Sequence, residues 1–375
     1  MTLIHSSARQ RPGLQAPVGG DDATVAAVED RIAQTIDSLR TMWADLASAV
    51  VPREGVLHTD SVIELLEGMV YSGGKRFRPR MAHWGWVAAG GQRTGIGHAD
   101  LITIGAALEL LHVFALIHDD VMDGSETRRG HASVHASARE QHLRLHGIGD
   151  PQRYGENIAI LAGDLSHSES GLLVATLPRP LQEVWRTLCV ELMMGQGRDL
   201  VGAANGRRDL AHAREVARAK SGAYTVWRPL QLGAVAAGAD SGTLAALERY
   251  GVAVGEAFAL RDDILGVIGD SATTGKPVGD DIVAGKPTVL MALAEQRFSP
   301  RWRRLLRRAA DGHASGRLVG ALQKELVTSG VIADVETMIR EAVSAAVLAL
   351  EDPAIDRAAV PGLEALARRV AWRDA

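Results

Sequence analysis

The chain has 375 residues, of which 46% are hydrophobic, 23% charged and 4% aromatic. These proportions are usual for a globular protein and exclude a collagen or a wholly disordered chain. The formal net charge of −4 lacks the basic excess of a general nucleic-acid binder, so we expect no nucleic-acid partner. A single cysteine, Cys189, excludes an intramolecular disulfide and a thiolate zinc site. We therefore expect a cytoplasmic protein.

Residues 1–21 are rich in Pro, Gly, Gln and Ser and predict a disordered N-terminal tail without the apolar core of a secretory signal. From residue 22 onward, apolar residues recur at helical spacing, and strand alternation is nearly absent. We expect helices near 24–50, 59–71, 77–89, 99–123 and 241–268. The pattern predicts one large all-α domain over 22–375, a helical bundle. No run of 18 apolar residues occurs, so no transmembrane segment is expected.

The first acidic cluster ends the apolar pattern at 99–123, in the sequence HDDVMDG. Asp119 and Asp123 are four residues apart, so their carboxylates share one helical face. Their mutual repulsion, and the unfavourable end of the helix dipole, favour a bound divalent cation such as Mg²⁺. Arg128 and Arg129 follow at once and suit phosphate oxygens. The combination predicts a site for a diphosphate and its metal ions.

A second apolar helix, near 241–268, delivers Asp262 and Asp263. A loop rich in Gly and Asp follows and carries Lys276 and Lys286. Its glycines make this loop adaptable enough to close over a polyanion. Two Asp-ended helices in one all-α chain also argue against an unrelated surface turn.

Two further segments place cations at predicted helix starts, where phosphate binds well. One contains Gly73, Gly74, Lys75 and Arg78, and the other contains Lys220. Each signal is weak in isolation.

Taken together, these segments resemble the trans-isoprenyl diphosphate synthases of the polyprenyl synthetase family. The matching segments lie in order between residues 59 and 350. They are GGKRFRP (73–79), HDDVMDGSETRRG (118–130), GD (163–164), GQGRDL (195–200), KSGAYT (220–225), RDDILGVIGD (261–270) and GKPVGDDIVAGKPT (275–288). The resemblance implies a large helical bundle of the isoprenoid synthase type around a central cavity, and a homodimer. It implies a prenyltransferase that joins an allylic diphosphate head to tail with isopentenyl diphosphate.

The resemblance also assigns residues. It implies about three Mg²⁺ ions per site, with Mn²⁺ as an alternative. The metal ligands and the substrate-binding residues are then as follows: Asp119, Asp120 and Asp123 for metal on one side and Asp262 on the other; Arg128, Lys220, Ser221, Lys276 and Lys286 for the allylic diphosphate; and Lys75, Arg78, His112 and Arg129 for isopentenyl diphosphate. His112 lies seven residues before Asp119, hence on the same helical face. We also expect Gln196 and Asp199 to line the cavity.

Two positions depart from the family pattern. Gly266 stands where the second cluster often has its last Asp, and Ala259 stands where Gln is usual. In the family, bulk just before the first cluster limits the length of the product. Phe114, five residues before Asp119, with the small Ala115 beside it, resembles geranylgeranyl (C20) diphosphate synthases.

Other readings stay open. The product could be farnesyl diphosphate or a longer prenyl diphosphate. Alternatively, the protein could be a non-catalytic partner subunit, which the loss of the usual Gln at Ala259 favours. A terpene cyclase would show a different second motif and would not need Lys75 and Arg78. The basic stretch 301–308 is interpreted as a solvated helix face.

Overall fold

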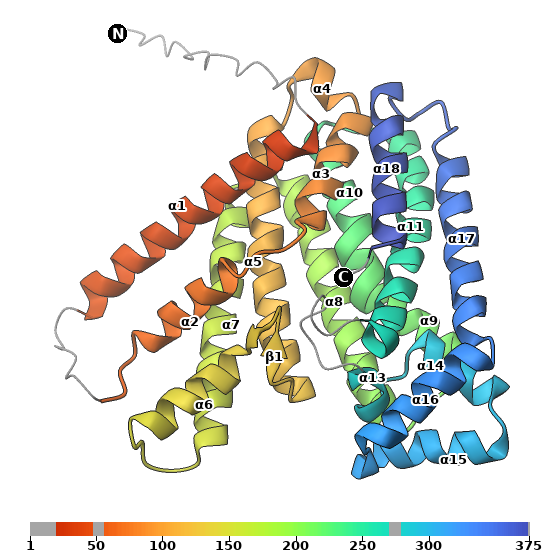
Figure 1. Ribbon diagram of the computed structural model, residues 1–375. Helices are drawn as coiled ribbons and strands as arrows, with labels where there is room; N and C mark the ends of the chain where they lie inside the picture. Colours follow the sequence, from red (N-terminus) through yellow and green to blue (C-terminus); the bar gives the residue numbers. More distant parts are fainter. Residues whose placement is uncertain (1–19, 48–55, 270–278, 374–375) are drawn as a thin grey trace, which may run out of the picture.

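A computed structural model describes residues 20–47, 56–269 and 279–373, and nearly all of them are helical (Figure 1). The all-α prediction is confirmed. The helices are α1 (Asp21–Ala47), α2 (Ser61–Val70), α3 (Phe77–Ala88), α4 (Gly91–Thr94), α5 (His98–Asp123), α6 (Val134–Arg144), α7 (Pro151–Ala175), α8 (Arg179–Ala204), α9 (Leu210–Val216), η1 (Ala217–Trp227), α10 (Arg228–Ala236), α11 (Ser241–Ile268), α13 (Asp280–Val283), α14 (Val289–Arg297), α15 (Pro300–Arg308), η2 (Ala309–His313), α16 (Gly316–Thr328), α17 (Val331–Ala349), η3 (Arg357–Ala359) and α18 (Val360–Ala371).

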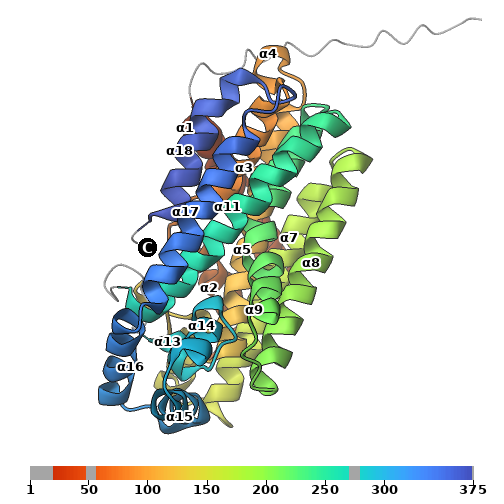
Figure 2. The same ribbon diagram turned by 90° about the vertical axis from the view of Figure 1, so that its right-hand side faces the viewer.

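Helix α5 forms the middle of the bundle, as its all-round apolar sequence predicts (Figures 1 and 2). It ends at Gly124, whose φ of 64° is left-handed and therefore suits glycine. Among the described residues, α5 is the one helix long and apolar enough to cross a membrane, but 61% of its most apolar window is buried inside the bundle. That burial is typical of a core helix.

Helix α11 joins two apolar cores. Leu247, Tyr250 and Val254 belong to the larger core, built mainly from α1 to α10 and α18. Ile264 and Val267, farther along the same helix, belong to a smaller core with α14 to α17. The middle of α11 is thereby anchored in the larger core and its C-terminal end in the smaller one, which fixes the position of the second acidic cluster.

Glycines allow the π-helical segment η1 to lie close to its neighbours. A Cβ on Gly195 of α8 would come within 2.5 Å of the Lys220 backbone nitrogen. Gly222 of η1 and Gly255 of α11 face each other, and a Cβ on Gly255 would lie 3.0 Å from the Gly222 Cα. These contacts bring Lys220 to the middle of the bundle.

Three local expectations need correction or qualification. A two-stranded hairpin that the sequence did not predict pairs β1 (Thr127–Arg128) with β2 (His131–Ala132). Its turn residues Arg129 and Gly130 both have positive φ, 54° and 79°, as a two-residue hairpin requires. Asp21, assigned to the tail, instead starts α1 and pairs with Arg80 at 2.9 Å. Residues 1–19 lie outside the described part of the chain, so disorder of the tail stays a prediction.

Candidate active site

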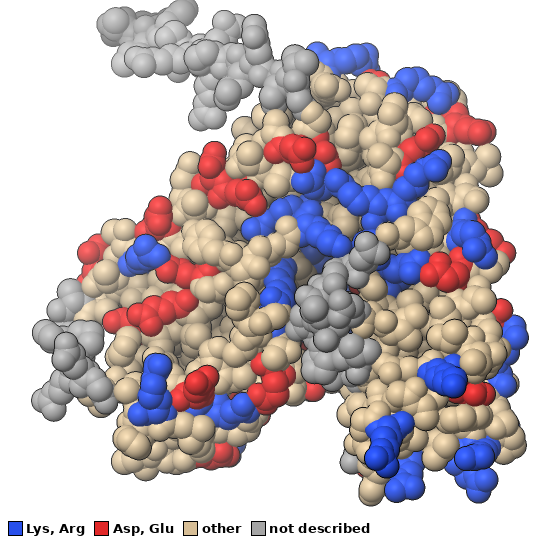
Figure 3. Space-filling model, in the orientation of Figure 1, with Lys and Arg blue, Asp and Glu red and all other residues tan. Residues whose placement is uncertain are grey.

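A cavity of about 730 Å³ opens between the two acidic helix ends. On the face of the molecule drawn in Figure 3, Lys and Arg side chains gather around the middle. The lining includes most of the predicted site residues: Lys75, Arg78, His112, Asp119, Arg128, Arg129, Asp199, Lys220, Ser221, Ala259, Asp262 and Lys286. Residues up to 211 positions apart in the chain, Lys75 and Lys286, therefore form one site.

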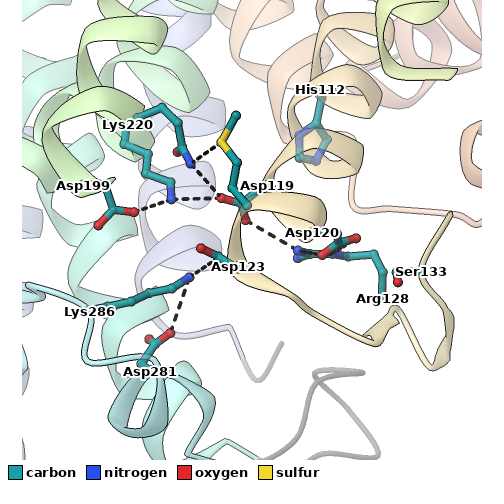
Figure 4. A network of polar contacts seen from close by, with 12 residues as sticks. His112, Asp119, Asp120, Asp123, Arg128, Ser133, Asp199, Lys220, Asp281 and Lys286 are labelled. Carbon is teal, nitrogen blue, oxygen red and sulfur yellow. Dashed lines mark hydrogen bonds and ion pairs between the residues drawn. The ribbon is translucent and has the colours of Figure 1, made fainter. Parts of the chain in front are cut away.

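Two lysines bridge the first acidic cluster to neighbouring helices (Figure 4). The Lys220 Nζ lies 3.0 Å from Oδ1 of Asp119 and 2.6 Å from Oδ2 of Asp199. The Lys286 Nζ lies 2.5 Å from Oδ2 of Asp123 and 3.9 Å from Oδ1 of Asp281. Asp119 lines the cavity, and Asp123 lies beside it, paired with Lys286, which also lines the cavity.

Both lysines stay protonated. Burial by itself lowers the pKa of Lys220, but the charges of Asp119 and Asp199 outweigh it and raise that pKa above the ordinary value. The pKa of Lys286 is raised in the same way: burial opposes the charge, and Asp281 and Asp123 overcome that effect. The site therefore holds ion pairs between lysines and aspartates. A diphosphate with its metal ions carries both signs of charge, so the lysines are able to bind the phosphates and the aspartates the metal ions.

Asp120 does not line the cavity as its neighbour Asp119 does. Its side chain is 2% exposed, and its Oδ1 and Oδ2 accept hydrogen bonds from the Arg128 Nε at 3.0 and 3.1 Å. The Arg128 Nη2 also donates to Asp120. Adjacent helical residues point about 100° apart, and in the structure this carboxylate holds Arg128 at the cavity wall. Metal binding by Asp120 therefore stays a prediction.

The second acidic cluster divides in the same way. Asp262 lines the cavity and accepts a hydrogen bond from Arg373, whose guanidinium lies 4.1 Å from the ring centre of Phe258. Asp263 also lines the cavity, but its Oδ2 accepts a hydrogen bond from the backbone nitrogen of Val289 at 2.9 Å, at the start of α14. Burial, and repulsion from Asp281, raise the pKa of Asp263 well above its ordinary value.

The departure at Gly266 has a physical reason. A Cβ at this position would lie 2.1 Å from Oδ2 of Asp281. Asp281, from α13, therefore occupies the space that a third aspartate of the α11 cluster would need. A carboxylate remains at this wall, although a different segment supplies it.

The cationic wall lies across the cavity from α11. Arg78 is 7% exposed, donates from Nη2 to Oγ1 of Thr225 at 3.0 Å, and has a buried Nε without a partner in the described chain. Arg129 donates to Oγ of Ser72 at 2.9 Å, beneath the loop at Gly73. Burial lowers the pKa of Arg129, and Arg76, Arg128 and Arg78 lower it further against the opposing effect of Glu109. Such crowded arginines favour a bound anion.

Comparison with known proteins tests the resemblance to the polyprenyl synthetase family. Residues 60–323 match the polyprenyl synthetase family. The chain is 32% identical over 281 residues to a short chain isoprenyl diphosphate synthase of Methanothermobacter thermautotrophicus, covering 73% of this chain and 79% of the relative. The chain belongs to the polyprenyl synthetase family.

Within this family, the chain is 34% identical to the geranylgeranyl diphosphate synthase of Mycobacterium tuberculosis, over 60% of this chain and 59% of that one. A crystal structure of geranylgeranyl pyrophosphate synthase from Corynebacterium glutamicum, complexed with isoprenyl diphosphate and magnesium, has a TM-score of 0.87 at 34% identity. It covers 95% of this chain and 100% of that one. The chain is a trans-isoprenyl diphosphate synthase, a prenyltransferase with the isoprenoid synthase fold.

The carboxylates of this site suit Mg²⁺, which needs few protein ligands when phosphate oxygens and water are present. Among the residues that the structure describes, no three His, Cys, Asp or Glu side chains converge closely enough to hold a metal ion alone. Asp119 instead offers a carboxylate on one side of the cavity, with Asp123 next to it, paired with Lys286, and Asp262 offers a carboxylate on the other side. Mg²⁺ commonly takes one or two carboxylates and completes its shell with phosphate oxygens and water.

Three predicted residues, Lys276, Gln196 and Phe114, are not among the described residues that line the cavity. Lys276 lies outside the described residues. Gln196 reaches Asp119 at 3.5 Å but is absent from the cavity lining, so its expected role there stays a prediction. Phe114 is absent from the described cavity lining and packs between His118 and His167, with ring centres 4.6 and 4.8 Å away. Its role as the floor of the product pocket therefore stays a prediction.

Sequence reasoning missed two residues of this site. Arg373 lies 111 residues after Asp262, and no spacing pattern connects them. The sequence assigns Tyr224 no role beyond packing or a hydrogen bond within the bundle, but this residue lines the cavity and contacts His112. Its position four residues after Lys220, in the KSGAYT segment, was the available signal.

Proposed function

We propose that this prenyltransferase makes geranylgeranyl diphosphate from isopentenyl diphosphate and a shorter allylic diphosphate. One observation carries the proposal: two acidic helix ends and an arginine wall line the same cavity. The names of the Mycobacterium and Corynebacterium relatives support the C20 product.

In the proposed mechanism, Lys220, Lys286 and Arg128 hold the allylic diphosphate at the first acidic cluster, with Ser221 beside them. Asp119, Asp123 and Asp262 would hold the Mg²⁺ ions, three in the full site, which neutralise charge on the leaving diphosphate when bound. Lys75, Arg78, His112 and Arg129 hold isopentenyl diphosphate at the other wall. Cations placed around the leaving group stabilise the charge that develops as it departs.

The reaction balances without a side-chain base. The C1–O bond of the allylic diphosphate breaks, and pyrophosphate leaves with the electron pair. The double bond of isopentenyl diphosphate then forms a bond to the allylic carbon. A proton is lost next to the new cation, and the released pyrophosphate accepts it.

We also propose a cytoplasmic homodimer, formed through α7 and α8, which lie side by side at one edge of the bundle (Figure 2). Both helices expose large apolar side chains there: Ile160, Leu161, Leu172, Val190, Met193 and Val201. Exposed apolar surface of this kind commonly marks an interface. Light scattering after gel filtration tests the dimer, and Met193→Lys should release monomers; an unchanged mass for that variant would argue against this interface.

A product assay tests the function. Purified protein is incubated with Mg²⁺, isopentenyl diphosphate and each of the C5, C10 and C15 allylic diphosphates, and the prenyl alcohols are identified after phosphatase treatment. We expect a C20 product that Asp119→Ala abolishes and that Asp37→Ala, a change on the exposed face of α1, leaves intact. Folded wild-type protein that elongates no starter would overturn the proposal and favour a partner subunit.

A further inference from the structure

Tyr224 and His112 form a hydrogen-bonded pair at the wall of the cavity. The Tyr224 hydroxyl lies 2.7 Å from Nδ1 of His112, and the tyrosine is 5% exposed. Both residues line the cavity, and the structure gives the other ring nitrogen of His112, Nε2, no partner among the described residues. In Figure 4 the imidazole points from α5 toward the charged network.

The surroundings decide which atom of the pair carries the proton. Arg78 lies over the Tyr224 ring, with its Cζ 4.1 Å from the ring centre, and a guanidinium has only donors. His112 Nδ1 is therefore the acceptor that the described chain offers to the Tyr224 hydroxyl proton. Burial raises the pKa of Tyr224, so the hydroxyl keeps its proton. Burial and the charges of Arg78, Arg129, Arg128 and Arg76 lower the pKa of His112 well below its ordinary value, so the imidazole is neutral.

A neutral imidazole with an acceptor at Nδ1 carries its single proton at Nε2. We propose that Tyr224 is a positioning residue, which fixes His112 as the Nε2–H tautomer and so presents a hydrogen-bond donor to the diphosphate of isopentenyl diphosphate. The inference rests on the proposed function. With the other tautomer, Nε2 would present a lone pair to the phosphate oxygens and repel them.

The same segment also supports Arg78. Thr225 accepts a hydrogen bond from Arg78 Nη2 at 3.0 Å, while the Arg78 Nε is buried without a partner in the described chain. Segment η1 therefore carries Lys220, at the allylic side, and the Tyr224–Thr225 pair, at the isopentenyl side. This assigns a reason for tyrosine at a position that ordinary packing would fill with any apolar side chain.

The first experiment measures steady-state kinetics of Tyr224→Phe. Losing one hydrogen bond and the fixed tautomer should raise the KM for isopentenyl diphosphate about tenfold, while the KM for the allylic diphosphate stays within about twofold. Tyr250→Phe is the matched control, because it removes another buried hydroxyl, which donates to the Leu363 carbonyl at 2.7 Å far from the cavity wall. A general loss of packing would affect both variants and both substrates.

A double-mutant cycle then tests the tautomer itself. The amide nitrogen of His112→Gln takes the place of Nε2–H and has no tautomers, whereas His112→Asn places its amide near Nδ1. We expect His112→Gln to keep the lower KM for isopentenyl diphosphate of the two, and Tyr224→Phe to add less than about twofold in the Gln background.

An unchanged KM for isopentenyl diphosphate in Tyr224→Phe, or the same tenfold rise in the Gln background, would overturn the inference while leaving the proposed function intact. A wild-type enzyme that forms no product would overturn the proposed function and this inference with it.

Discussion

The Asp120–Arg128 pair provides a direct test of how the first acidic cluster is divided between metal binding and support. The two side chains are 2% and 11% exposed, and three contacts join them. Removing one partner of a buried ion pair costs about 3–5 kcal/mol. Asp120→Asn keeps one acceptor oxygen, and Asp119 lies 3.6 Å from the guanidinium, so we expect a loss of about 2–3 kcal/mol in the free energy of unfolding.

Thermal unfolding measures this loss. With an unfolding entropy of about 2.1 cal/mol/K per residue, a chain of 375 residues should lose about 3–4 °C in Tm. Arg128 loses its fixed position as well, so the KM for the allylic diphosphate should rise about tenfold. The Mg²⁺ concentration for half-maximal activity should stay near that of the wild type.

Asp119→Asn is the matched comparison, because this neighbouring carboxylate faces the cavity. It should shift the Mg²⁺ dependence strongly and change Tm little. If Asp120→Asn instead shifted the Mg²⁺ dependence as much as Asp119→Asn and left Tm unchanged, Asp120 would be a metal ligand and the division argued from the structure would be wrong.

Two further substitutions test the steric reason for Gly266 in the second acidic cluster and the pH dependence that buried His83 gives to stability. Gly266→Asp restores the aspartate usual in the family but places its Cβ 2.1 Å from Oδ2 of Asp281, so it should lower the free energy of unfolding by about 1–3 kcal/mol and lower kcat. Gly320→Asp is the control, because a Cβ at Gly320 meets nothing within 4 Å. Equal losses of stability for the two variants would contradict the steric reason. Burial lowers the pKa of His83 from 6.5 to about 4. Between these pH values the unfolded chain binds a proton that the folded chain does not, so stability should fall by about 3 kcal/mol as pH drops from 6.5 to 4. His83→Asn, which keeps a partner for Thr24, should flatten denaturation curves measured across this range, whereas an unchanged slope would show that another group dominates.

Helices and their acidic ends were predictable because their signals are local. The spacing of Asp119 and Asp123 already placed them on one helical face, and the apolar pattern near 99–123 gave the helix that carries them. The β1–β2 hairpin was not predictable from alternation, because two-residue strands have no period to detect. Arg373 joins Asp262 only through the packing of α18 beside α11, which no local pattern records.

The two Asp pairs show what spacing leaves undecided. In each pair the first carboxylate lines the cavity, and the second accepts hydrogen bonds from a neighbouring segment of the protein. Asp120 accepts from Arg128. Asp263 accepts from the first backbone amides of α14, three residues after Lys286.

Each second carboxylate therefore positions a cation of the cavity, Arg128 directly and Lys286 through the start of α14. Each pair of aspartates at a helix end thus combines a carboxylate at the cavity with support for a neighbouring cation.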